Sequence, residues 1–383
     1  MIKPLTIVGG GPVGLIFALL NKNIDVLVLE SKSKKESEKD TRALALSNSS
    51  RFVLERIGVW DFLESKITDI KSIHTSQKGT FGRTLMKAKE YNQEALGYIV
   101  AYGDLIKSLQ DVINSIKKIK VLHNTKANQF LKKKDKATLL FDNNGNEQSV
   151  DLNLLILADG GNAKIRGLDI RRKTKSFNHS AIVTQVTSEV NHSNIAYERF
   201  TSMGPIALLP NLNNRFSLVW TGPTDEIVKL NKKNDKDFLI DLHEYFGDRV
   251  GKFTSCGNRI TFPLNQSYIE QNLNKNIAVI GNSAQTMHPV AGQGLNTGIK
   301  DALVLSDCIY ANDEVVQIEL LLKKYNQLRY SETKALLNLT EFLVNFFSNN
   351  FIGLNKFRGI ALTFLDLSPP IKKSFVRKMS FGK

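Results

Sequence analysis

The stretch LTIVGGGPVGLIFALLNKNIDVLVLE, residues 5–30, decides the fold of this chain. It opens with an apolar run at residues 5–8, continues into a glycine-rich loop at residues 9–14, and then begins an apolar helix. Residues 25–30 form a second apolar run, which ends in an acidic residue. This order predicts a βαβ unit whose strands are buried.

The glycine loop has the spacing of a dinucleotide-binding site. Gly9, Gly11 and Gly14 follow the pattern G-x-G-x-x-G between the strand and the helix, and Glu30 ends the next strand. Glycines let the backbone approach a pyrophosphate, the helix N-terminus offers N–H groups, and a carboxylate accepts from ribose hydroxyls. A carboxylate at position 30 favours an unphosphorylated adenosine ribose, so FAD or NAD fits better than NADP.

The composition excludes several classes of protein. The chain has 383 residues, 42% hydrophobic and 23% charged, with a formal net charge of +15. This charge is spread along the chain instead of forming a basic motif with aromatic residues, so we expect no nucleic-acid partner. Its two cysteines and six histidines show no ligand spacing, so no metal site is expected. No apolar run is long enough to span a bilayer, and the first residues lack a signal-peptide cleavage site.

Later segments extend the sheet and add a second one. Residues 154–158 and 277–280 are further apolar runs that predict buried strands. Residues 176–265 alternate in polarity between turns, which predicts a separate antiparallel sheet. The polar residues 31–40 are typical of a loop, and residues 70–100 have no strong periodicity.

Three segments, taken in chain order, resemble the FAD-dependent aromatic hydroxylases. After the first βαβ unit, residues 40–47 are similar to that family's arginine-bearing stretch, with Arg42 as its arginine. Asp159-Gly160, followed by Arg166, resembles the family's Asp-Gly motif, which serves both the flavin and the pyridine nucleotide. Residues 281–298, GNSAQTMHPVAGQGLNTG, look like the motif that holds the ribitol chain and the flavin ring.

The resemblance implies an α/β fold with an FAD-binding, Rossmann-like domain of the aromatic hydroxylase type, an antiparallel-sheet substrate domain and C-terminal helices. The implied cofactor-binding residues are Gly9, Gly11, Gly14, Glu30, Arg42, Asp159, Gly160, Gly281, Asn282, Gly292, Gly294, Leu295 and Asn296. The implied flavin-ring contacts are His288, Pro289, Gly292 and Gln293. No residue is assigned as a certain acid, base or nucleophile.

Smaller segments resemble the ubiquinone-biosynthesis hydroxylases within that family. They are residues 196–200, 204–210, 219–221, 262–264 and 340–348. Asn282 and Gln285, with His288, resemble the 2-polyprenyl-6-methoxyphenol hydroxylase branch, because other branches have Asp and His at the first two positions. Three further departures from the wider family are Ala163 for a common Ser, Gly103 for a frequent Arg, and a short segment between Gly14 and Glu30.

The resemblance implies an FAD-dependent monooxygenase in which NAD(P)H reduces the flavin and O₂ adds at C4a. The hydroperoxyflavin so formed would hydroxylate the ring of a polyprenylphenol. The reductant stays open between NADH, NADPH and a protein. Two other functions also stay open: another flavoenzyme such as an epoxidase or a prenyl reductase, and an idle FAD-binding scaffold of a membrane assembly with other ubiquinone-biosynthesis proteins.

The expected FAD-binding domain is discontinuous, comprising residues 1–70, 101–175 and 275–330. The expected substrate domain comprises residues 71–100 and 176–274, and residues 331–383 form the C-terminal helices. Within the last part, residues 371–379 predict a short amphipathic helix with four cations. A water-insoluble polyprenyl substrate then favours a cytoplasmic protein bound peripherally to the surface of the inner membrane.

Overall fold

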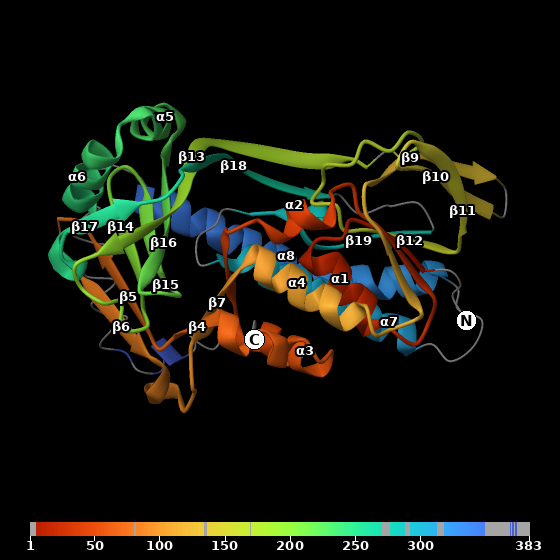
Figure 1. The fold of residues 1–383 in the computed structure, drawn as a ribbon, viewed down its shortest axis with the longest axis horizontal. Helices are drawn as coiled ribbons and strands as arrows, with labels where there is room; N and C mark the ends of the chain where they lie inside the picture. The colour runs from red at the N-terminus through yellow and green to blue at the C-terminus, as the bar shows by residue number, and fades with distance from the viewer. Residues whose placement is uncertain are drawn as a thin grey trace.

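The computed structural model describes residues 5–79, 82–133, 136–168, 170–269, 276–287, 292–311 and 318–348, together with residues 368, 370, 372 and 373. Figure 1 shows an elongated molecule with a parallel sheet and its helices in one part, and a large sheet covered by α5 and α6 at the other end. The long strands β13 and β18 run between the two parts.

The first part is built on a five-stranded parallel sheet in the order β19-β12-β1-β2-β8. Its strands are β1 (Leu5–Val8), β2 (Val26–Leu29), β8 (Ile119–Leu122), β12 (Leu154–Leu157) and β19 (Ile277–Val279). The predicted βαβ unit and the two later buried strands are therefore confirmed.

Both faces of this sheet are covered, which explains why β1, β2, β12 and β19 are apolar, whereas the edge strand β8 carries the exposed Lys120. Ile7 and Ile156 point into a core shared with α3 (Asn48–Arg56) and four other helices, whereas Val8 and Leu157 point into a core shared with a small sheet. The other four helices are α1 (Pro12–Leu20), α4 (Tyr102–Ile113), α7 (Gln293–Tyr310) and α8 (Ile318–Ser348). The small sheet comprises β9 (Thr125–Lys133), β10 (Lys136–Asn143) and β11 (Asn146–Leu152).

The second part is a nine-stranded sheet in the order β20-β18-β13-β16-β15-β14-β5-β6, with β17 paired to β13. Its strands are β5 (Ser72–Gln77), β6 (Arg83–Lys87), β13 (Arg172–Ser188), β14 (Ile195–Phe200), β15 (Pro205–Asn211), β16 (Arg215–Pro223), β17 (Phe253–Cys256), β18 (Ile260–Ile269) and β20 (Gln285–Thr286). The predicted antiparallel sheet is present, except that β14 pairs with β5 in parallel. The helices α5 (Thr224–Lys232) and α6 (Asp235–Phe246) cover one face through a core that includes Trp220.

The prediction of a loop at residues 31–40 is wrong for residues 34–38. It contains the helix α2 (Lys34–Glu38), which begins with a capping box: the Ser33 side chain accepts from the Glu36 N–H, and the Glu36 carboxylate accepts from the Ser33 N–H. Residues 70–100, which lack periodicity, supply β5, β6 and the strand β7 (Gly97–Ala101). A three-stranded sheet joins β7 to β3 (Ala43–Leu46) and β4 (Ile67–Ile70).

The remaining helical elements are short. They are η1 (Trp60–Phe62), η2 (Glu64–Lys66), η3 (Ala88–Tyr91), η4 (Asp248–Val250) and η5 (Gly281–Ser283). In the described part of the chain, no helix has both the length and the apolarity that crossing a bilayer requires. The predicted amphipathic segment at residues 371–379 lies outside the described residues, apart from Lys372 and Lys373.

Candidate active site

The glycine loop lies between the end of β1 and the start of α1, and its shape requires glycine. Gly9 has a φ of +110°, and a Cβ atom there would lie 2.4 Å from the carbonyl oxygen of Ala158. At Gly14 a Cβ atom would lie 2.0 Å from the carbonyl oxygen of Gly9. The first turn of α1 has no side-chain cap. Its N–H groups are therefore available for the pyrophosphate of a dinucleotide, so the loop fits FAD.

Glu30 is buried beneath the same loop and helps to shape it. One carboxylate oxygen accepts from the Gly10 N–H at 2.6 Å, and the other accepts from the Lys32 N–H at 2.8 Å. A carboxylate has about four lone-pair sites, so both oxygens keep capacity for the ribose hydroxyls assigned to Glu30.

Arg42 lies between the two parts of the molecule. Its guanidinium donates to Asp40 over 2.5–2.9 Å and lies 5.3 Å from the ring centroid of Tyr102 and 5.5 Å from that of Phe262. The Tyr102 hydroxyl is 3.4 Å from the position that a Cβ atom of Gly11 would occupy. Burial raises the pKa of Tyr102 to about 12, so this hydroxyl keeps its proton and can donate to a ligand on the loop. The sequence carried no signal for Tyr102.

Asp159 follows β12 and connects it to η5. One carboxylate oxygen accepts from the Ser283 hydroxyl at 2.6 Å, and the other accepts from the Ala163 N–H at 2.5 Å. The Ser that the family commonly has at position 163 is thus not needed to hold Asp159. Gly160 follows with a φ of +73°, which favours glycine. Ser283 is fully buried and was not among the predicted site residues.

The flavin bed, defined here as η5 and residues 292–296, comes from two segments that meet. Asn282 is exposed, and its Oδ1 atom lies 3.8 Å from the position of a Cβ atom on Gly294. Gly281 and Gly292 both have positive φ, at 63° and 61°, and a Cβ atom on Gly292 would approach that of Ala45 to 2.9 Å. The bed therefore lies directly against β3.

Asn296 ties the flavin bed to β3 and to the start of α3. Its Oδ1 accepts from the Ser47 N–H at 2.8 Å and from the Ser50 hydroxyl at 2.7 Å. Its Nδ2 donates to the carbonyl oxygens of Ala45 at 3.0 Å and Gly292 at 2.9 Å. Both ends of the Asn296 amide are therefore occupied by hydrogen bonds within the protein, and Asn296 positions the bed. Leu295 is partly buried beside it.

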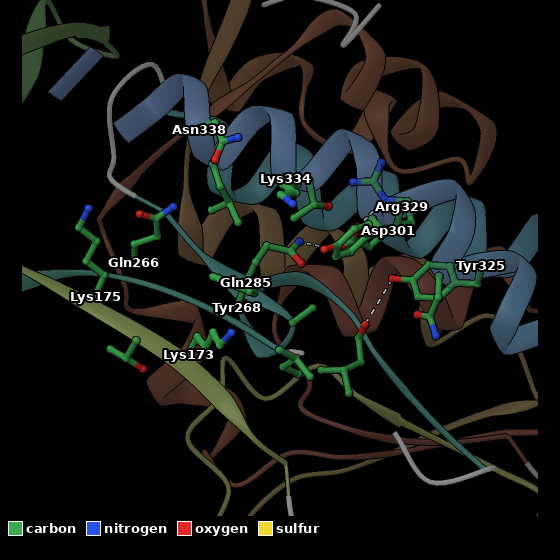
Figure 2. Close-up of a pocket in the computed structure, with 18 residues that line it drawn as sticks. Lys173, Lys175, Gln266, Tyr268, Gln285, Asp301, Tyr325, Arg329, Lys334 and Asn338 are labelled. Carbon is green, nitrogen blue, oxygen red and sulfur yellow. Dashed lines mark hydrogen bonds and ion pairs between the residues drawn. The ribbon is translucent and has the colours of Figure 1, made fainter. Parts of the chain in front are cut away.

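A buried charge pair, Asp301 and Arg329, is hydrogen-bonded to η5, and Figure 2 shows the pair beside Gln285. Asp301 accepts from the Gly281 N–H at 3.0 Å, from the Gln285 amide at 2.7 Å and from the Arg329 guanidinium at 2.7 Å. The sequence-based analysis assigned no role to Asp301 or Arg329. Behind the pair, a cavity of about 530 Å³ opens between β13, β18 and α8, and Lys173 is among the residues that line it.

The nine-stranded sheet turns its second face toward this bed. Ala196 and Leu209, from β14 and β15, pack in one apolar cluster with Ala43 and Ala45 of β3. Further along the same face, Phe262 lies under Arg42. This face of the sheet therefore lies opposite the expected flavin bed.

Two of the predicted flavin-ring contacts, His288 and Pro289, lie outside the described residues. Gln293 begins α7 next to Gly292. Within the residues that the structure describes, no cluster of His, Cys, Asp and Glu could hold a metal ion.

Comparisons with known proteins agree with this geometry. A family model described as an FAD binding domain matches residues 3–340. Ubiquinone hydroxylase UbiL of Rhodospirillum rubrum is 29% identical over 98% of this chain and 89% of its own. The 3-demethoxyubiquinol 3-hydroxylase of Escherichia coli is 26% identical over 97% of both chains.

Among solved structures, p-nitrophenol 4-monooxygenase PnpA of Pseudomonas putida has the same fold. It superposes with a TM-score of 0.80 over 99% of this chain and 97% of its own, at 15% identity. PqsL of Pseudomonas aeruginosa superposes with a TM-score of 0.75 over 94% of this chain and 99% of its own, at 18% identity. The match over residues 3–340 shows that this chain belongs to the FAD-binding family of flavin-dependent monooxygenases.

Proposed function

We propose that this monooxygenase hydroxylates the aromatic ring of a polyprenylphenol in ubiquinone biosynthesis. The observation that carries the proposal is similarity along almost the whole chain to two enzymes named as ubiquinone-ring hydroxylases. Bound FAD would supply the oxygen-transfer chemistry, with O₂ as the source of the oxygen atom. The residues of the chain have only to bind, orient and shield the substrate.

The sheet face opposite the flavin bed supports a flat, apolar substrate. Ala181, Ala207 and Val219 are small side chains on it, and Phe262 closes one end. Small side chains leave room for a ring, and an apolar surface keeps water from competing for the activated oxygen.

The reductant is proposed to be NADH or NADPH, bound beside Asp159. A cavity of about 370 Å³ opens there, and it is lined by Asp159 together with the cations Lys164, Arg166 and Arg172. Arginine and lysine suit the phosphates of a pyridine nucleotide. Anaerobic bleaching of the flavin by each nucleotide is the test, and bleaching by neither would transfer the role to a protein donor.

The substrate is tested by expressing the chain in a strain that lacks a ubiquinone-ring hydroxylase and identifying the quinone intermediates by mass spectrometry. The expected result is restored quinone with one added ring oxygen at the blocked step. Consumption of O₂ that an alkylphenol stimulates would support it further in the purified enzyme. An oxidised or reduced prenyl tail with an unchanged ring would instead show an epoxidase or a prenyl reductase.

Peripheral attachment to an anionic membrane is part of the proposal, because the product and substrate dissolve in lipid. Lys372 lies within 3.7 Å of Glu90 with its side chain 11% exposed, so the remaining tail cations would have to carry the attachment. Flotation of the full chain with anionic vesicles, compared at low and high salt with a chain truncated after Pro370, tests this. Equal flotation of both chains would exclude the tail.

A further inference from the structure

We propose that Glu198 is the base that accepts the proton of the substrate's phenolic hydroxyl. The inference rests on the proposed function and deepens it, because it assigns a catalytic residue on the protein side of the substrate. Glu198 belongs to the segment at residues 196–200 that resembles the ubiquinone-biosynthesis hydroxylases, but the resemblance implies no role for it.

The alternation of β14 places Glu198 on the face of the sheet that looks toward the flavin bed. Its two neighbours point the other way, toward α6: the Tyr197 ring lies 5.8 Å from the Phe246 ring, and the Arg199 Nε donates to the Tyr245 carbonyl at 3.2 Å. Successive side chains of a strand point to opposite faces. Glu198 therefore shares its face with Ala196, which packs with Ala43 and Ala45 of β3.

The cross-strand partners of Glu198 make this face apolar around one carboxyl group. Glu198 pairs with Thr75 on β5 and Ala207 on β15, and the row continues through Val219 and Val183. The next row along the strands contains Phe200, Pro205, Thr221, Ala181 and Phe262. Glu198 is the only ionisable side chain in these two rows.

Within the described residues, no hydrogen bond or ion pair holds the Glu198 carboxyl group, although its side chain is only partly accessible. The neighbouring titratable groups His74 and Arg199 lie on the far face of the sheet. On the facing part, Arg42 lies against Tyr102 and against Phe262 of β18, which β15, β16 and β13 separate from β14. Burial alone raises the pKa of Glu198, to about 7.

Hydroxylation of a phenol is favoured by a group that accepts the proton of the phenolic hydroxyl. Transfer of oxygen to an aromatic ring is an attack by the ring, so it is faster when the ring is electron-rich. When Glu198 accepts the proton, the phenol O–H bond breaks, an O–H bond forms on the carboxyl group, and the negative charge moves to the phenolate and its ring. The pKa of an ordinary glutamate lies about 6 units below that of a phenol, which is about 10. A pKa of about 7 for Glu198 reduces this difference to about 3 units and favours the proton transfer by about 10³-fold.

The test compares the FAD-loaded wild type with Glu198→Gln, Glu198→Asp and the control Glu226→Gln, which removes an exposed carboxylate on α5. The first readout is kcat/KM for 2-geranylphenol against pH. The second uses no turnover: the ¹³C resonance of the labelled hydroxyl-bearing carbon of 2-geranylphenol, bound to the oxidised enzyme without reductant, is followed against pH and reports the charge of the group that accepts from the hydroxyl. Thermal melting and flavin content show whether each variant folds.

The expected wild-type kcat/KM rises with pH through about 7, because only the carboxylate accepts a proton. Glu198→Gln should lower it by about 10²-fold or more, remove this rise and remove the wild-type shift of the bound ¹³C resonance near pH 7. Glu198→Asp should recover part of the rate with the rise intact, and Glu226→Gln should match the wild type.

A folded Glu198→Gln variant with the wild-type pH profile and the same pH-dependent ¹³C shift would overturn the inference while leaving the proposed function standing. A wild type that loads FAD but neither binds nor hydroxylates 2-geranylphenol would overturn both. A variant with a uniformly lower rate and an unchanged pH profile would show a structural role and would also overturn the inference.

Discussion

Replacing Asn296 by alanine tests whether this residue positions the flavin bed. The change removes four hydrogen bonds, two accepted by Oδ1 and two donated by Nδ2. It also leaves the Ser50 hydroxyl, which is 1% exposed, without this acceptor. At about 1 kcal/mol per hydrogen bond the loss is about 4 kcal/mol, and the better helix propensity of alanine offsets about 0.7 kcal/mol. We expect the free energy of unfolding of the apoprotein to fall by about 3 kcal/mol.

The assay is urea unfolding of the apoprotein, followed by titration with FAD. Because the bed would lose its ties to β3, FAD should bind at least about tenfold more weakly, or about 1.4 kcal/mol. Asn231→Ala is the matched control: it also removes a helical asparagine, but one whose buried Oδ1 has no hydrogen-bond partner. The control should change the unfolding free energy by less than about 0.5 kcal/mol.

The variant Asn296→Asp separates the two halves of the amide. It keeps an acceptor for Ser47 and Ser50 but turns a carboxylate oxygen toward the carbonyl groups of Ala45 and Gly292. It should therefore be at least as unstable as Asn296→Ala at neutral pH. If the apoprotein of Asn296→Ala is as stable as the wild type and only FAD affinity falls, Asn296 contacts the cofactor directly and the positioning argument is refuted.

Three further changes test two other parts of the site and one buried histidine outside it, His192. Gly14→Val should abolish FAD binding, because its Cβ would lie 2.0 Å from the Gly9 carbonyl; a yellow, FAD-saturated variant would contradict the loop assignment. Asp301→Leu should lower the free energy of unfolding in urea by about 3–5 kcal/mol, because it removes an anionic partner of the Arg329 guanidinium, whose side chain is only 7% exposed. The double variant Asp301→Leu, Arg329→Met should recover much of this loss. Burial lowers the pKa of His192, so the neutral ring stabilises the fold, and this stability should be lost as pH falls through the unfolded-state pKa of about 6.5. The urea midpoint should therefore fall less between pH 8 and pH 5 in His192→Gln than in the wild type. Equal falls would exclude His192 as a source of the pH dependence.

Four strands of the parallel sheet, β1, β2, β12 and β19, could be predicted because they are short, mostly apolar runs, and a glycine follows three of them within three residues. Such strands are buried on both faces, so their signal depends little on the rest of the fold. The strand β8 contains the exposed Lys120 and carried no such signal. The strands of residues 70–100 are different: β5 pairs in parallel with β14, more than a hundred residues away, and each strand has one exposed or polar side. The helix α2 had a readable signal in Ser33 and Glu36, but a polar run of five helical residues has no apolar periodicity.

The loop glycines and Glu30 could be predicted as site residues because their chemistry depends on local spacing. Ser283, Tyr102 and Asp301 could not, because each acts on a partner from a distant segment: Asp159, the glycine loop and Gly281. Gly103 stands where the family frequently has an arginine, and a contact with a distant segment explains the difference. A Cβ atom there would lie 2.0 Å from the carbonyl oxygen of Glu38 at the end of α2, so this chain leaves no room for a side chain.

Gln285 supports the flavin bed through the hydrogen bond that it donates to Asp301. The residue at this position must donate to Asp301, since that carboxylate already orients the Gly281 N–H at the centre of the flavin bed. A histidine, as other branches of the family have, could do so but would gain or lose a proton near neutral pH. An amide donates without titrating. The hydrogen bond from Gln285 to Asp301 therefore has a donor that does not titrate, in contrast to the rise in rate near pH 7 that we expect from Glu198 on the substrate side.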